Sequence, residues 1–82
     1  MAIETLPFIG AVRRMIRAAG RRTGDADEWE LAELITLRQA VEDAIQTAVD
    51  GQLATGRSWA AIATATGTSR QGAQQRYGRK AV

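Results

Sequence analysis

Apolar residues recur at spacings of three and four along most of this chain, and this feature most limits how the chain can fold. Such spacing gathers side chains on one face of an α-helix. No stretch alternates apolar and polar residues over a useful strand length, and there is no internal repeat or low-complexity tract. The sequence therefore predicts an all-α protein, and its length of 82 residues predicts a single helical domain over 1–82.

Glycine-containing boundaries divide the chain into three helical regions. The first is a basic amphipathic helix over 1–22. The second is a long helix over 25–55, which we expect to open with Asp25 as a cap and Glu28 reaching back to it in a capping box. The third is a pair of short helices within 58–78. We expect these four helices to make up the domain.

The charge is unevenly distributed, although the formal net charge is only +2. The segments 1–22 and 57–82 each hold five basic residues, against one acid in the first and none in the second. The segment between them is acidic, with Arg38 as its one basic residue. This pattern indicates either that a basic end meets a polyanion or that it pairs with the acidic segment of the same molecule.

Several classes of function are made improbable by composition. Cys and His are both absent, which removes thiolate chemistry, the commonest general base and the commonest transition-metal ligand. The acids from Asp25 to Glu33 suit the start of a helix better than general acid or base chemistry. We therefore expect no enzyme activity, no cofactor and no metal site. No apolar run reaches the ~20 residues of a membrane span, and the N-terminus lacks a secretory leader, so we expect no membrane partner and a cytoplasmic location.

The stretch SWAAIATATGTSRQGAQQRY, residues 58–77, contains the strongest geometric pattern. Gly67 can take the positive φ of a tight turn between two helices, and Ala63 offers a small side chain where the second helix approaches the first. Ser58 and Ser69 are placed to cap the two helices. The expected inward-facing residues are Trp59, Ile62, Ala73 and Tyr77.

This pattern resembles the helix-turn-helix of short DNA-binding proteins common in actinobacteria and their phages, in which a Trp, an Ile-Ala pair, a Leu-Gly turn and Ser-Arg-Gln follow in that order. It is similar, more distantly, to the DNA-reading helices of sigma factor region four. The resemblance covers about a quarter of the chain. Thr66 stands where the family usually has Leu and Thr68 where it usually has Val, which reduces the apolar contact between the two helices.

The resemblance implies that the helix from Ser69 to Tyr77 enters the DNA major groove. Its base-reading residues would be Arg70, Gln71, Gln74 and Gln75, because Arg pairs with guanine and Gln with adenine. Ser69 and Thr68 would contact phosphate. The further basic residues expected to attract the DNA backbone are Arg57, Arg76, Arg79 and Lys80.

Two other interpretations stay open. Arg and Gln are good helix formers, so the polar residues of 69–77 are also compatible with an ordinary solvated surface. The apolar stripe of the long helix, which includes Leu37 and Val41, is compatible with a homodimer through that helix. It is equally compatible with a protein-interaction adaptor of the antitoxin or host-factor-binding kind.

Overall fold

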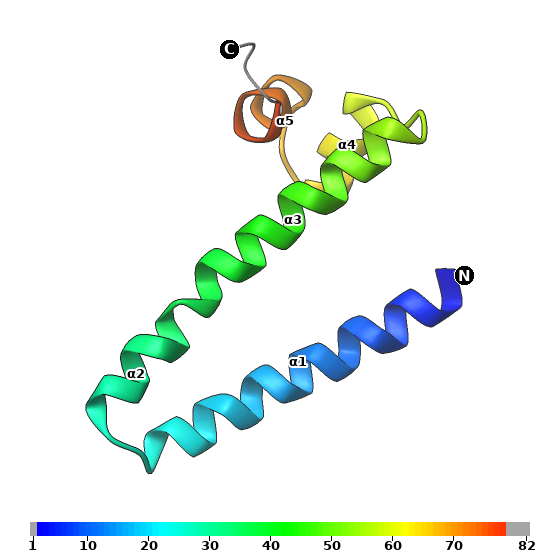
Figure 1. Cartoon of the computed structure of the whole chain (residues 1–82). Coiled ribbons are helices and arrows are strands. Elements are labelled where there is room, and N and C mark those ends of the chain that lie inside the picture. The colour runs from blue at the N-terminus through cyan, green and yellow to red at the C-terminus, as the bar shows by residue number, and fades with distance from the viewer. Residues whose placement is uncertain (1, 79–82) are drawn as a thin grey trace. The chain divides into compact units, whose positions relative to one another are not determined.

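The computed structural model describes residues 2–78, and every regular element in that range is an α-helix. The all-α prediction is therefore confirmed. The elements in chain order are α1 (Ala2–Gly24), α2 (Glu28–Ile35), α3 (Leu37–Ala54), α4 (Trp59–Thr66) and α5 (Arg70–Tyr77). They are labelled in Figure 1.

The chain divides into two compact units, Met1–Arg38 and Gln39–Val82. The first holds α1, α2 and the opening residues of α3. The second holds the rest of α3 with α4 and α5. The expectation of one domain over 1–82 stays a prediction.

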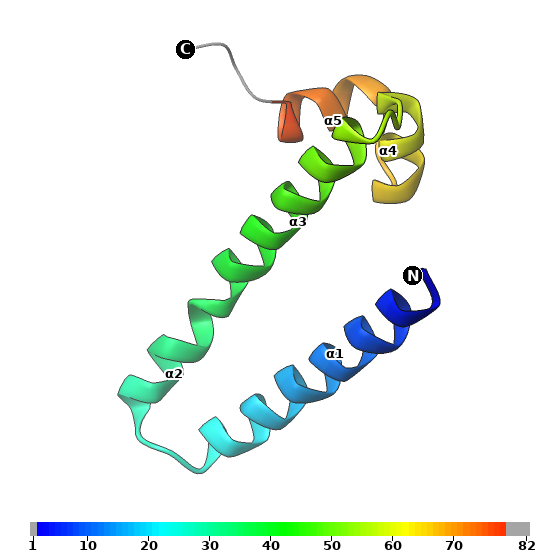
Figure 2. The same ribbon diagram turned by 45° about the vertical axis from the view of Figure 1, so that its right-hand side comes forward.

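The first unit is a helical hairpin in which α1 and α2 run in opposite directions, as both ribbon views show (Figures 1 and 2). The capping box expected from Asp25 and Glu28 is wrong. Asp25 still donates its backbone N–H to the carbonyl of Arg22 at 3.2 Å, and so belongs to the last turn of the first helix. Asp27 occupies the N-cap position instead, with extended backbone angles and no side-chain cap bond.

The expected continuous helix over 25–55 is interrupted at Thr36, which separates α2 from α3. The Thr36 backbone N–H donates to the Glu33 carbonyl, three residues back, at 3.1 Å, and its hydroxyl donates to the same carbonyl. A hydroxyl that bonds a carbonyl of the preceding turn competes with the regular helical hydrogen bond. Two helical segments therefore stand where the sequence predicts one.

The second unit has a small core built where α4 and α5 gather beside the C-terminal part of α3 (Figures 1 and 2). Its buried members come from all three helices, and they are Val49, Ile62, Ala63, Ala73 and Tyr77. Ile45, Leu53 and Trp59 pack against them from the edge. Three of the four expected inward residues, Ile62, Ala73 and Tyr77, are thus buried, and Trp59 is partly buried.

Glycines with positive φ follow two of the helices of this unit, α3 and α4. Gly56 follows α3 with φ 98°, and Gly67 follows α4 with φ 74°. Both serine caps form as expected: Ser58 Oγ accepts from the Ala61 N–H at 3.1 Å, and Ser69 Oγ accepts from the Gly72 N–H at 3.0 Å. The short turn between α4 and α5 is therefore fixed by one left-handed glycine and one cap.

The left-handed conformation of Gly67 gives a stability prediction. Gly67→Ala should lower the free energy of unfolding by about 1–2 kcal/mol, because a Cβ is strained at this φ. Thermal or urea unfolding followed by circular dichroism measures the change. The matched control is Gly51→Ala, which lies inside α3 with nothing within 4 Å of the added Cβ. This control should raise stability by up to about 1 kcal/mol, and a stabilised Gly67→Ala would contradict the prediction.

Candidate nucleic-acid interface

The polar residues of α5 form one exposed surface. At 100° per residue, Arg70, Gln71, Gln74 and Gln75 fall within a contiguous arc of about 140°. All four are exposed, whereas Ala73 and Tyr77 turn into the core. The core contacts of α5 therefore leave this arc free, and we call it the α5 polar face.

The turn before α5 places two hydroxyl groups at the N-terminus of the helix. Both Thr68 and Ser69 are exposed. The Thr66 and Thr68 hydroxyls lie 3.3 Å apart and form a hydrogen bond. The residues that stand where apolar side chains were expected from the resemblance thus contact each other through polar atoms. Thr68 also donates to the Ser69 carbonyl at 3.2 Å.

An acid on α3 holds Arg76, which is one of the basic residues expected to attract the DNA backbone. Its Nη2 donates to Glu42 Oε1 at 3.1 Å, and its guanidinium lies 5.6 Å from the centre of the Tyr77 ring. The Tyr77 side chain and then the Glu42 carboxylate raise the pKa of Arg76 above its ordinary value, so the guanidinium stays charged. Its side chain is still 59% exposed, which leaves a second partner accessible.

Gln46 fixes the C-terminal end of α5 and was missed by sequence reasoning. Its Nε2 donates to the Tyr77 carbonyl at 2.8 Å and to Asp50 Oδ1 at 3.0 Å. One amide thus joins α3 to the last turn of α5. Neither Gln46 nor Glu42 carries a local sequence signal for this role, since each partner on α5 lies more than thirty residues away in the chain.

Arg57 lies just before the cap of α4 and is exposed. Its backbone N–H donates to the Gln52 carbonyl at 3.0 Å, which holds the connection between α3 and α4. Arg57 also borders a hollow of about 380 Å³ between these helices, with Ile45, Val49 and Ile62 among its lining residues. Arg79 and Lys80, the other two predicted backbone contacts, lie outside the described residues.

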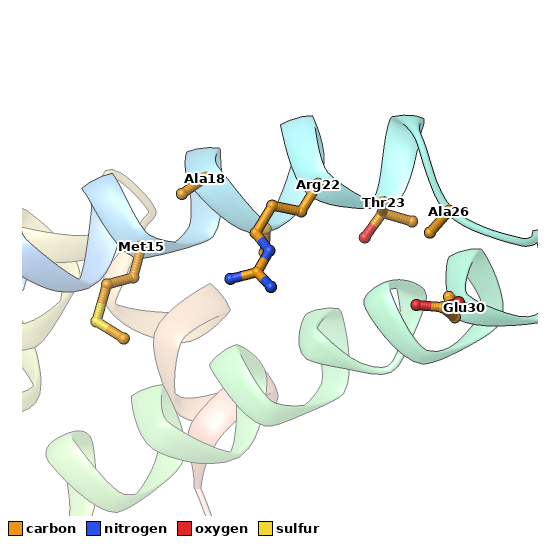
Figure 3. Close-up of a pocket in the computed structure, with 7 residues that line it drawn as sticks. Met15, Ala18, Arg22, Thr23, Ala26 and Glu30 are labelled. Atoms are coloured by element: carbon orange, nitrogen blue, oxygen red, sulfur yellow. The ribbon is translucent and has the colours of Figure 1, made fainter.

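The first unit has a separate hollow of about 580 Å³ beside the hairpin. Figure 3 shows Met15, Arg22 and Thr23 projecting from α1 toward the side on which α2 lies, with Glu30 on α2. The other lining residues, Ala18, Ala19 and Ala26, are small and apolar. Across residues 2–78 no cluster of three or more acidic side chains is placed to hold a metal ion.

Comparison with protein-family models, with curated proteins and with solved structures found no match for this chain. None of the helices within residues 2–78 combines the length and the apolar character that crossing a membrane requires.

The contact between Gln46 and α5 gives a second stability prediction. Gln46→Ala should lower the free energy of unfolding by about 1–2 kcal/mol, because the partly buried Tyr77 carbonyl loses its donor. Gln39→Ala is the matched control, since Gln39 makes the same kind of bond to the residue four positions on, at 2.9 Å to Asp43, without reaching α5. Urea unfolding of both variants checks the difference. Equal losses in the two would show that the bond to α5 adds nothing.

Proposed function

We propose that this chain is a small, sequence-specific protein that binds double-stranded DNA, in which α4 and α5 form a helix-turn-helix and α5 enters the major groove. The observation that carries the proposal is the α5 polar face, a contiguous exposed arc of one Arg and three Gln on a helix whose other side is held in a core. No acid lies between Gly51 and the end of the chain to repel phosphate.

The chemistry of this face fits base edges. Arg70 suits the two acceptors of guanine, and each of the glutamines suits the donor and acceptor pair of adenine. Thr68 and Ser69 lie at the helix N-terminus, where hydroxyl groups and the helix dipole favour phosphate. Arg57 and Arg76, with Arg79 and Lys80 of the C-terminal segment, supply the sequence-independent attraction.

The biological role that fits such a protein is transcription regulation, or a phage-encoded control or accessory function, carried out in the cytoplasm. A single short reading helix buries little surface, so we propose that two copies act together on a two-fold symmetric site.

The direct test is selection of bound sequences from a random DNA pool, followed by binding titrations with the enriched site. Arg70→Ala should weaken binding to that site by roughly 5- to 150-fold, which corresponds to 1–3 kcal/mol for a bidentate base contact. Binding to unrelated DNA should change much less. Arg38→Ala is the control, because Arg38 is an exposed arginine that belongs to the other unit, Met1–Arg38, and is not a member of the α5 polar face. The proposal is wrong if no sequence is enriched and no binding occurs at low salt.

The ion pair between Glu42 and Arg76 provides a further prediction about DNA affinity. Glu42→Gln should strengthen binding to unrelated DNA and steepen its dependence on log salt by up to about 0.9, because one more guanidinium becomes available to a phosphate. Asp43→Asn removes the same charge at the next position of α3, where the carboxylate accepts a hydrogen bond from Gln39 and, within residues 2–78, pairs with no arginine. If both variants bind alike, only net charge matters and Arg76 is not a phosphate contact.

The second candidate function is that of a protein-interaction adaptor. It is favoured by the exposure of two apolar residues on α3, Leu37 and Val41, which belong to the apolar stripe predicted for the long helix. Leu37 is 37% exposed and Val41 is 44% exposed, so neither is sealed in a core. Leu37→Glu and Val41→Glu should then leave folding intact and abolish capture of the protein partner in a pull-down. Unfolding of these variants would identify the stripe as core and remove the support for an adaptor.

A further inference from the structure

Most of the arginines of the first unit are gathered on one side of α1. At 100° per residue, four of the five arginines of this helix fall within an arc of about 100°. All four are exposed, and they are Arg13, Arg14, Arg17 and Arg21. By the 1.5 Å rise per residue they extend over about 12 Å of the helix. We call these four residues the α1 arginine row.

The row lies away from the side of α1 that faces α2. The residues of α1 that line the hollow beside α2 fall within a separate arc of about 140°, and they are Met15, Ala18, Ala19, Arg22 and Thr23. Figure 3 shows Met15, Arg22 and Thr23 projecting toward α2. No member of the row lines the hollows that α1 shares with α2 in the described part of the chain.

The acids of the first unit do not pair with the row within residues 2–78. Among the positions three or four residues from a member of the row, Asp25 is the one acid, four residues after Arg21, and the two form no ion pair. Glu30 borders the hollow beside Arg22, which is the arginine of α1 outside the row. The interpretation that the basic N-terminal segment is neutralised by the neighbouring acidic segment is therefore not supported for these four arginines.

The acids of the second unit already have partners. Gln39–Val82 contains three acids, Glu42, Asp43 and Asp50. Each accepts a hydrogen bond from a side chain of its own unit, and the donor to Glu42 is the guanidinium of Arg76. A contact between one of these carboxylates and the row would have to compete with a bond that is already made.

The row is unfavourable for the helix without an anionic partner. Arg17 lies three residues from Arg14 and four residues from both Arg13 and Arg21. Like charges at these spacings destabilise a helix by roughly 0.2–0.5 kcal/mol per pair. A helix face that meets only water commonly alternates charges of both signs, whereas arginines gathered along one side of a helix are typical of contact with a polyanion.

We propose that the α1 arginine row binds the phosphate backbone of duplex DNA, as a contact separate from the α5 polar face. This inference rests on the proposed DNA binding, which supplies the polyanion. Duplex DNA carries one negative charge per ~1.7 Å of its axis, so about seven charges lie alongside the ~12 Å of the row. Each guanidinium can bind two phosphate oxygens at once. The row adds affinity for any DNA sequence and no preference among sequences.

The experiment measures binding of the full chain to a duplex of unrelated sequence over a series of salt concentrations. Arg13→Gln/Arg17→Gln should reduce the slope of log affinity against log salt by up to about 1.8, because two phosphate contacts are lost at about 0.9 each. Arg22→Gln/Arg38→Gln is the matched control, since it removes two exposed arginines of the same unit that lie outside the row. This control should change the slope little. Equal slopes in the two variants overturn the proposal.

A charge-retaining variant separates loss of charge from damage to the helix. Arg13→Lys/Arg17→Lys should keep the wild-type slope, because the release of counterions depends on the number of charges at the phosphates. If its slope falls as far as that of Arg13→Gln/Arg17→Gln, the loss does not come from charge, and the proposal is overturned.

The outcomes for the row are distinct from those for the α5 polar face. Arg13→Gln/Arg17→Gln should weaken binding to the enriched site and to unrelated DNA by the same factor, whereas Arg70→Ala lowers the ratio between the two affinities. If no sequence is enriched but the Gln variant still weakens binding, sequence reading fails and the row stands. If a sequence is enriched and the Gln variant behaves like its control, the row alone fails. Absence of any DNA binding at low salt overturns both.

Discussion

The close approach of α5 to α4 and α3 is the contact on which the rest of the second unit depends. Ala73 has no exposed surface, and Ala63 in the facing helix is 5% exposed. Two such small residues let helix backbones come closer than leucine or phenylalanine would allow. Because Ala73 is fixed in the core, the opposite side of α5 is fixed in its direction as well, and this side holds the polar residues.

Hydrogen bonds between helices act together with the small core to hold α5 in place. Five buried residues are a modest core, so the hydrogen bonds that join helices weigh heavily in placing α5. Its first turn is closed by the Ser69 cap, and its last turn is held from α3 by Gln46. Each end of the helix is thus tied independently, which is the arrangement needed for side chains that must meet a rigid partner in register.

Local chemistry explains how far the sequence alone could predict this structure. Gly67 and the two serine caps were predictable because a left-handed turn and an N-cap depend on one residue and its immediate neighbours. The break at Thr36 was not, because threonine occurs inside helices and only its hydrogen bond to Glu33 marks the interruption. The contacts of Glu42 and Gln46 with α5 could not be predicted from the sequence either, because they depend on how helices far apart in the sequence pack together. DNA reading by the α5 polar face is still a prediction. The contact of Arg79 and Lys80 with the DNA backbone is a prediction as well.

The composition of the α5 polar face has a kinetic consequence if this face reads DNA. Three of its four members are neutral amides and only Arg70 is charged. Amides discriminate between base edges but add little to the attraction for any phosphate backbone. A protein built in this way would leave unrelated sequences quickly and spend its bound time where the amide pattern matches. The rate at which the protein finds its DNA site would then depend on the few arginines outside the α5 polar face. The base contacts of α5 would decide only which site is kept.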